Sequence, residues 1–210
     1  MEVIKLIDIA NKGEITSFIG NIEIVNNIVL PRLSSEDGTI FNYFKKFCDK
    51  EKLLKAFSTL DIKEDVLANN INEISQALKN KLAIVEALVN NEEELIFNNI
   101  HKGLSYREIQ TIKRILKKFI EYNKKVLIIT DDVEFLFGLT KNLVIVNDNN
   151  YIKMSPVNWL DLKIYDYVSK PPIIDFVLNC KQRGIKIDDS FETKELLKAI
   201  YRSVDKWDIY

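Results

Sequence analysis

The chain has 210 residues, enough for one sizeable hydrophobic core with a small addition and too few to favour two full domains. Hydrophobic residues make up 47% and charged residues 29%, as in soluble globular proteins. The 30 basic and 31 acidic side chains nearly cancel, so the charge gives no electrostatic reason to expect a nucleic-acid partner.

The sequence also lacks the usual marks of secretion, membrane insertion and metal binding. No apolar run approaches the roughly 18 residues of a membrane span, and no N-terminal stretch has the pattern of a secretory signal. Cys48 and Cys180 are far apart and do not have the spacing of metal ligands, so we expect both to be reduced. A cytoplasmic protein without a metal centre is expected.

The first part of the chain predicts a buried strand that ends at a glycine turn. Residues 4–9 partly alternate and form a hairpin-like pair with a strand over 15–19, which stops at Gly20. A helix is expected from Glu23 to about Pro31. This layout is typical of phosphate-binding loops, but their chemistry needs several small residues, a Lys and a Ser or Thr. Only Gly20 meets that requirement, and a strand-turn-helix without a ligand is the simpler interpretation.

The next segment predicts helices that serve mainly for packing. Four aromatic residues fall within 41–47, and nothing beside them could do chemistry. Helices are expected over about 49–60 and from about 65 to 72. Residues 73–89 carry a broad apolar surface, which predicts a helix buried against a sheet.

A short strand over 95–97 then ends at two amides, Asn98 and Asn99. This is the kind of strand end at which an ATP-hydrolysing parallel sheet carries two acids. His101 follows in the loop, with no second ligand or nucleophile in view. We favour a solvated loop histidine over a catalytic one.

The following helix and strand have clear boundaries. Ser105 and Glu108 have the spacing of a capping box, and a buried stripe follows over 109–119. Residues 126–130 predict a strand buried on both faces, which ends at Asp131 and Asp132. These carboxylates could bind a metal or share a proton. We favour the alternative, in which Asp131 caps the next helix with Glu134 three residues on.

The remaining elements predict an α/β domain followed by helices. A helix over 133–141, a strand over 143–146 and a hairpin into 151–153 complete a mostly parallel sheet by residue 154. We therefore expect a domain over 1–154 and a helical extension over 155–210, with a segment at 159–168 and helices over 172–184 and 193–207. Such amphipathic helices must cover the α/β domain or a second chain.

In order and spacing of motifs, the chain resembles the nucleotide-binding subunit of ABC transporters over essentially its whole length. Residues 12–20, Lys-Gly-Glu-Ile through Phe-Ile-Gly, look like the approach to the Walker A loop of that family, and 73–88 look like its signature motif and helix. Residues 94–100 are similar to the Walker B strand, Gly103-Leu104-Ser105 to the D-loop, and 126–132 to the switch strand. The Pro-initiated helix, Gly184 and the 193–197 helix start resemble the extension of energy-coupling factor ATPases, which import vitamins and metals.

The resemblance implies a P-loop NTPase fold, with ATP and Mg²⁺ as the family's ligands, but the chain departs from the family at each catalytic position. The resemblance places Asn26 at the position of the Walker A lysine and Asn27 at that of the metal-binding hydroxyl. It places Asn98 and Asn99 at the positions of the Walker B acids. It places Asp131 at the switch histidine. Of the signature residues Ser75 is retained, while Gln76 and Ala77 replace glycines, and the Gly20 to Ser75 interval is shorter than in the family.

These departures predict a non-catalytic pseudo-ATPase that binds no cofactor and acts as a structural or regulatory subunit. The expected partner is a protein, either a second copy bound through the C-terminal helices or a transporter at the inner face of the membrane. The residues expected at such interfaces are Gly103, Leu104, Ile174, Val177, Leu197 and Tyr201. Two alternatives stay open, a divergent ABC subunit that still binds or slowly hydrolyses ATP, and an unrelated α/β binding module.

Overall fold

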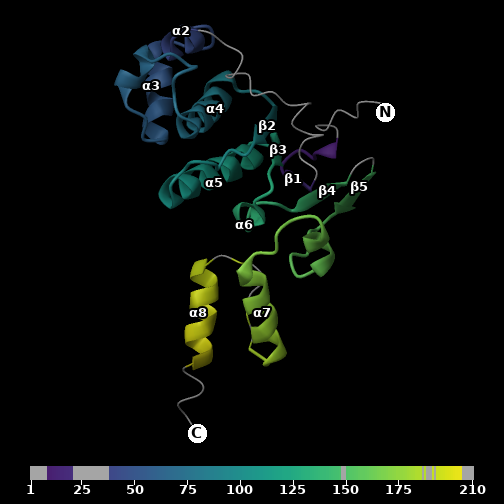
Figure 1. Ribbon diagram of the computed structural model, residues 1–210. Coiled ribbons are helices and arrows are strands. Elements are labelled where there is room, and N and C mark those ends of the chain that lie inside the picture. Colours follow the sequence, from purple (N-terminus) through teal and green to yellow (C-terminus); the bar gives the residue numbers. More distant parts are fainter. Residues whose placement is uncertain are drawn as a thin grey trace.

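A five-stranded sheet with helices packed beside it forms the centre of the computed structural model, which describes residues 9–20, 38–147, 150–185, 187, 191 and 193–204 (Figure 1). The strand order is β2-β3-β1-β4-β5. The first four of these strands are parallel and β5 is antiparallel to β4, as a mostly parallel α/β fold requires. The predicted fold class is therefore confirmed.

The strand bounds agree closely with the sequence pattern. They are β1 Ile15–Gly20, β2 Glu94–Asn98, β3 Lys125–Ile129, β4 Asn142–Asn147 and β5 Asn150–Met154. Central strand β1 is buried along nearly its whole length because β3 and β4 pair with it on either side. The expected hairpin between β4 and β5 is present.

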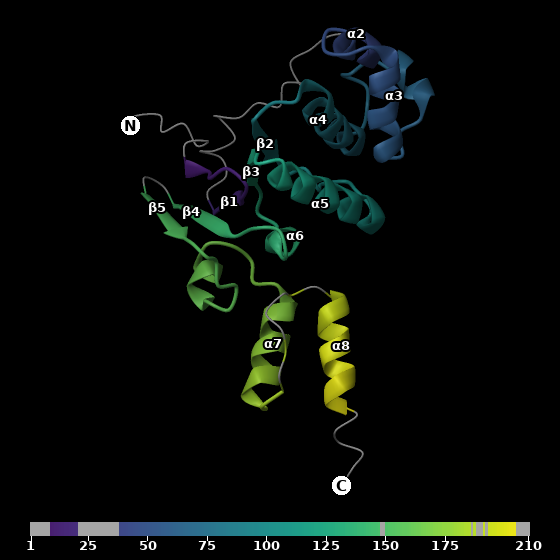
Figure 2. The same cartoon turned by 180° about the vertical axis from the view of Figure 1, so that it is seen from behind.

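The helices before β3 begin at the capping residues of the sequence. Asp49 caps α3 (Lys50–Thr59), Ser75 caps α4 (Gln76–Asn90), and Ser105 forms a complete capping box with Glu108 at the start of α5 (Tyr106–Glu121). A short helix α2 (Ile40–Phe44) precedes them. Figures 1 and 2 show α4 and α5 beside the sheet, with α2 and α3 farther out.

Three predicted helices are much shorter than expected. The one predicted from residue 65 is a 3-10 turn, η3 Glu64–Ala68, because residues 69–71 pair with 38–40 in extended conformation. The one predicted over 133–141 is α6 Val133–Leu136, because Phe137 leaves the helical conformation with ψ 131° and Gly138 follows with a positive φ. The one predicted over 159–168 is η4 Leu162–Asp166. The Tyr165 hydroxyl donates a hydrogen bond to the Trp159 carbonyl, and this bond holds the first residues of the predicted helix in a turn.

The two C-terminal helices lie side by side and extend away from the sheet (Figures 1 and 2). They are α7 Pro172–Gln182, which starts at Pro and is followed by Gly184 at φ +76°, and α8 Thr193–Val204. Ile174 and Val177 of α7 are fully buried in the core of the chain, whereas Leu197 and Tyr201 of α8 are exposed. Ile174 and Val177 are therefore not accessible to a partner.

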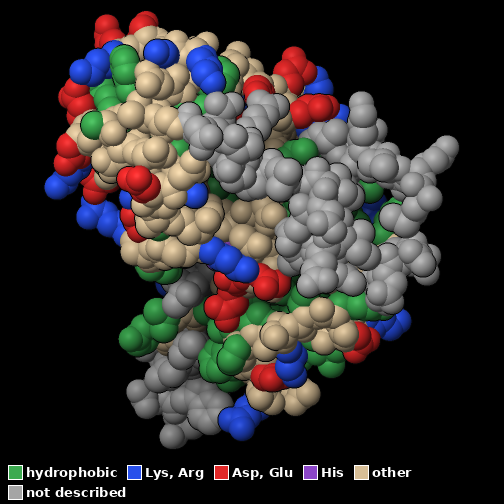
Figure 3. Space-filling view, turned by 45° about the horizontal axis from the view of Figure 1, so that its top comes forward, with side chains coloured by type: hydrophobic (Ala, Val, Ile, Leu, Met, Phe, Trp, Pro, Cys, Tyr) green, Lys and Arg blue, Asp and Glu red, His purple; other side chains and the backbone are tan. Residues whose placement is uncertain are grey.

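Part of the prediction lies outside the described residues, namely residues 4–8 of the strand over 4–9, the helix over 23–31 and residues 205–207 of the last helix. In the part of the chain that the structure does describe, no helix has the length and hydrophobicity needed to cross a membrane. On the face shown in Figure 3, acidic and basic side chains are intermingled around the α2–α3 region at the upper left.

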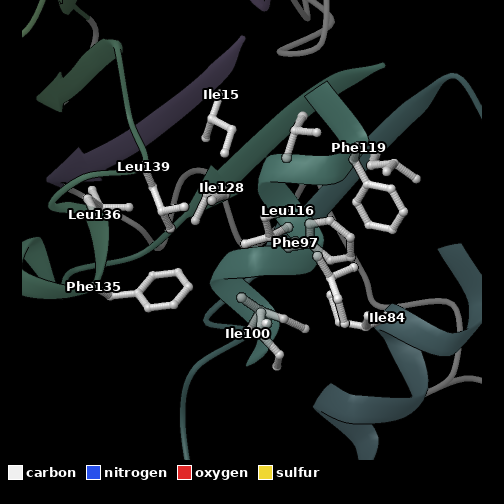
Figure 4. Close-up of a cluster of buried hydrophobic side chains, with 14 of the residues drawn as sticks. Ile15, Ile84, Phe97, Ile100, Leu116, Phe119, Ile128, Phe135, Leu136 and Leu139 are labelled. Atoms are coloured by element: carbon white, nitrogen blue, oxygen red, sulfur yellow. The ribbon is translucent and has the colours of Figure 1, made fainter. Parts of the chain in front are cut away.

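The hydrophobic core lies between the sheet and the helices. Ile84 of α4, Leu116 and Phe119 of α5 and the β-strand residues Ile15 and Ile128 belong to one cluster, part of which is drawn in Figure 4. The same cluster includes C-terminal residues such as Trp159, Ile174 and Leu196. Phe137 joins the two parts, with ring centroids 5.2 Å from Trp159 and 5.0 Å from Phe191. The predicted boundary at residue 154 thus falls within one continuous core, and the division into a domain over 1–154 and a helical extension over 155–210 stays a prediction.

Candidate functional site

The carboxyl edge of the parallel strands is the candidate site, because open α/β sheets bind ligands there. β1 ends at Gly20, β2 at Asn98 and β3 at Ile129, and their parallel pairing brings these ends to one edge of the sheet. Of the predicted nucleotide-site residues, Gly20, Asn98, Asn99 and Asp131 lie at or next to this edge. Asn26 and Asn27 are outside the described residues.

Gly20 is explained by the packing of the sheet alone. It has φ +103°, and a Cβ atom added to it would lie 2.2 Å from the carbonyl oxygen of Val146 on β4. Any side chain at this position would collide with the neighbouring strand. The presence of glycine here therefore does not by itself indicate a phosphate-binding loop.

The two amides at the end of β2 are engaged within the protein. The Asn99 side chain donates to Asn98 Oδ1 (2.9 Å) and accepts from the Thr130 hydroxyl (3.3 Å), and its backbone N–H donates to the Ile129 carbonyl (2.8 Å). Asn99 also has φ +48°, a left-handed conformation that Asn tolerates better than most residues. Both the backbone and the hydrogen bonds thus favour an amide at position 99.

The two carboxylates after β3 have different partners, and the prediction that Asp131 caps the next helix is wrong. Asp132 is the cap of α6: its Oδ1 accepts from Phe135 N–H at 3.1 Å. The Thr130 hydroxyl accepts from Asp132 N–H, which turns the chain so that residue 132 reaches the helix start. Asp131 is exposed and pairs with Lys102 at 3.4 Å.

His101 is buried, so the prediction of a solvated loop histidine is also wrong. Its Nε2 lies 3.2 Å from Asp132 Oδ2, and its ring stacks on Phe135 with centroids 4.7 Å apart. Phe135 provides an apolar platform and Asp132 a polar partner for Nε2, whereas the buried Nδ1 has no hydrogen-bond partner among the described residues, which makes burial of the ring costly. The hydrogen bond from His101 is the main cause that lowers the pKa of the Asp132 carboxyl below its ordinary value, with the helix-capping N–H groups adding to it.

Asn80 of α4 holds the loop after β2 from the other side. Its buried amide donates to the carbonyls of Asn99 (3.2 Å) and Lys102 (2.9 Å), and accepts from Gln76 at 2.9 Å. Gly103 lies against Ala77: a Cβ at Gly103 would be 3.4 Å from the Ala77 side chain. The segment of the predicted signature motif and the predicted D-loop are therefore in contact within one chain. Ser75 serves as the cap of α4.

Sequence reasoning missed Asn80, one of several polar residues in α4 and one that is buried, and the roles of Thr130 and Asp132. A buried polar residue on a predicted core face is the signal that could have revealed Asn80. The pairing of His101 with Asp132 joins residues 31 positions apart, and no local sequence pattern predicts it.

The chemistry available at this edge is limited. Both carboxylates are occupied by cationic or hydrogen-bonding partners, and the described residues contain no group of three or more His, Cys, Asp or Glu that could hold a metal ion. The β2 end offers neutral amides, which are not useful general bases. Within the described residues, the arrangement stabilises the loop.

Comparison with known proteins places this chain near ABC ATPases. No protein-family model matches it. A protein of Pyrococcus abyssi assigned as an ABC transporter ATP-binding protein is 26% identical over 131 residues, which cover 61% of this chain and 48% of the relative. A protein of Treponema denticola with the same assignment is 28% identical over 80 residues, which cover 38% of this chain and 16% of the relative. The chain thus spans less than half the length of these curated relatives.

Solved structures show the fold. The ATP-binding subunit of an ABC transporter superposes with a TM-score of 0.60 at 12% identity, covering 81% of this chain and 90% of that one. A structure described as a cobalt transport ATP-binding protein gives 0.57 at 13% identity, covering 71% of each chain. The RNase-L inhibitor gives 0.57 at 16% identity, covering 78% of this chain and 44% of that one. The chain therefore has the fold of an ABC ATPase domain and weak homology to ABC transporter ATP-binding proteins.

Proposed function

We propose that this protein is a non-catalytic, ABC-type pseudo-ATPase that acts as a structural or regulatory interaction subunit. The observation that carries the proposal is the end of β2, where Asn98 and Asn99 occupy the positions that the resemblance assigns to the catalytic acids. Their amides are hydrogen-bonded to each other and to Thr130. A residue that polarises water needs a basic oxygen, which an amide does not provide.

Electrostatics at the same edge add to the proposal. Phosphoryl transfer depends on cations that neutralise the developing charge. The resemblance assigns the lysine and metal-ligand positions to Asn26 and Asn27, which supply neither the cation nor the metal-binding hydroxyl of the family. Asp131 stands at the switch-histidine position and would bring a negative charge toward a γ-phosphate, which is repulsive.

The partner in this proposal is a protein. A subunit of the ABC type works by association, and the exposed side chains of Leu197 and Tyr201 on α8 give an apolar surface for it. The similarity to a cobalt transport ATP-binding protein favours a transporter of the energy-coupling factor type. Association with such a transporter would put the protein at the inner face of the membrane.

Nucleotide binding decides between this proposal and a divergent ATPase. We expect no saturable binding of Mg-ATP in a fluorescent-nucleotide titration and no phosphate release above that of buffer. Micromolar affinity that Asn26→Glu abolishes, while Gln110→Glu on the exposed face of α5 leaves it unchanged, would overturn the proposal. Both variants add one negative charge. Gly20 is unsuitable as a test position because any substitution there disturbs the sheet.

A further inference from the structure

The short helix α6 lies between two parts of the molecule and contacts both. Figures 1 and 2 show it between α5 and the C-terminal helices α7 and α8. It has only four residues, Val133–Leu136, and three of them are buried. A single helical turn gains too little from its own hydrogen bonds to be stable alone. The stability of α6 therefore depends on the contacts made at its two ends.

The start of α6 is bound to the loop after β2. Asp132 Oδ2 lies 3.2 Å from His101 Nε2, and the Phe135 ring stacks on the His101 ring with centroids 4.7 Å apart. Figure 4 shows Phe135 turned toward the cluster of buried side chains. The buried Nδ1 of His101 has no hydrogen-bond partner among the described residues, and an unpaired polar atom opposes burial. This contact is therefore easier to release than the burial of His101 alone would indicate.

The end of α6 is bound to the C-terminal part of the chain. The Phe137 ring packs against Trp159 with centroids 5.2 Å apart, and it lies 5.0 Å from the ring of Phe191, which shortly precedes α8. All three aromatic side chains are buried. Leu196, in the first turn of α8, is buried in the same cluster. Because such interiors are closely packed, a shift of Phe137 would disturb the start of α8.

A lysine of α5 contacts both ends of α6. Lys113 Nζ donates to the Phe137 carbonyl at 3.1 Å and lies 5.4 Å from the centroid of the Phe135 ring. The residue that stacks on His101 and the residue that packs on Trp159 are thus held by one side chain. Since α6 is a single turn, its unwinding would release the contacts at both ends together and not one by one.

We propose that α6 is a conformational relay that couples the loop after β2 to the C-terminal helices. In one state the turn is wound, His101 is buried against it, and Phe137 holds the start of α8. In the other state the turn is unwound and both contacts are lost. Coupling through such a two-state element is reciprocal, so a contact that releases His101 weakens the hold on α8, and the reverse. Leu197 and Tyr201 are exposed on α8, and a partner bound to them would therefore act on the loop after β2, whether or not the sheet edge binds nucleotide.

The test is amide hydrogen exchange of the full chain, without nucleotide or partner, read separately over residues 99–104, α3, α7 and α8. His101→Ala removes both contacts with the start of α6, and we expect it to speed exchange in α7 and α8 by about threefold or more. Phe137→Leu weakens the ring contacts at the other end and should speed exchange over 99–104 to a similar extent. Exchange in α3, which lies farther from α6, should stay within about twofold of the native rate in both variants.

Lys102→Ala is the matched control, because it removes the exposed pair with Asp131 that joins the same two segments next to His101. It should leave exchange in α7 and α8 within about twofold of the native rate. The relay is refuted if each variant speeds exchange only around its own position, or if Lys102→Ala acts on α8 as strongly as His101→Ala. It is also refuted if α3 exchanges faster by the same factor as α8, which would mean a general loss of stability. If His101→Ala does not fold, His101→Gln replaces it, since Gln keeps a donor for Asp132 but loses the stacked ring.

Discussion

At the scale of single residues, the buried pair of His101 and Asp132 fixes the loop after β2 to the segment after β3. Asp132 also caps α6, so one carboxylate both pairs with His101 and caps a helix. Asn is as good a helix cap as Asp but carries no charge. Asp132→Asn therefore separates the contact with His101 from the capping role.

We expect Asp132→Asn to lower the free energy of unfolding by about 1 kcal/mol near neutral pH, because the Asp132 side chain is 41% exposed and its charge is partly screened. The folded-state pKa of Asp132 lies below its ordinary value of 3.8. Its contribution is thus present above that value and is lost as the pH falls through the lower folded pKa. Urea unfolding should show a difference in the free energy of unfolding between Asp132→Asn and the native protein at pH 7, and a smaller difference in acid. A difference that does not change with pH would mean that the charge of Asp132 plays no part.

Gly20 gives a second prediction at this scale. Gly20→Ala should lower the free energy of unfolding by about 2–4 kcal/mol, because the new Cβ meets the Val146 carbonyl and the residue keeps a positive φ. Gly38→Ala is the matched control, since Gly38 has φ +114° with nothing within 4 Å of an added Cβ. Gly38→Ala should lower the free energy of unfolding only by the cost of backbone strain, about 1 kcal/mol. Thermal melting of both variants measures the contrast, and equal losses would refute the close approach.

At the scale of elements, local sequence patterns predicted most helix starts and strands correctly, but they did not predict contacts between residues that are distant in sequence. Residue types at positions 105 and 108 predicted the capping box of α5, and the apolar run at 126–129 predicted a buried parallel strand. The short η3 was missed because its end depends on pairing with residues 38–40, which are distant in sequence. The site shows the same division: the amides at 98 and 99 are visible in the sequence, but the burial of His101 depends on Phe135 and Asp132 from another element.

The capping box of α5 gives a prediction at this scale. Lys81 and the Ser105 side chain and N–H lower the pKa of Glu108 to about 2. Glu108→Gln keeps a side chain that can complete the box but loses the charge, so we expect it to lower the free energy of unfolding by about 1 kcal/mol at neutral pH. Since the ordinary pKa is 4.5, the loss should shrink as the pH falls from about 4.5 to about 2. Unfolding curves across this range test it, with Gln110→Glu on the same helix as the control.

At the scale of the whole molecule, one core joins the sheet, α4, α5 and the C-terminal helices. Ile174 and Val177 turn inward to this core, while Leu197 and Tyr201 of α8 turn outward and are 48% and 69% exposed. Residues 197 and 201 are one helical turn apart and thus form one stripe. The sequence predicted the amphipathic helices, but it could not say which apolar residues the fold itself would use.

Self-association through this α8 stripe is the prediction that belongs to the whole molecule. An isologous contact repeats the same stripe on both partners, so each apolar substitution acts twice in a dimer. We expect the native chain to sediment as a dimer and Leu197→Glu/Tyr201→Glu to sediment as a monomer with an unchanged melting temperature, because both side chains are exposed in the single chain. Tyr151→Glu/Ile152→Glu is the control, since these side chains on β5 are 53% and 44% exposed and lie far from α8 along the chain. A native chain that is monomeric at every concentration would refute self-association through this stripe.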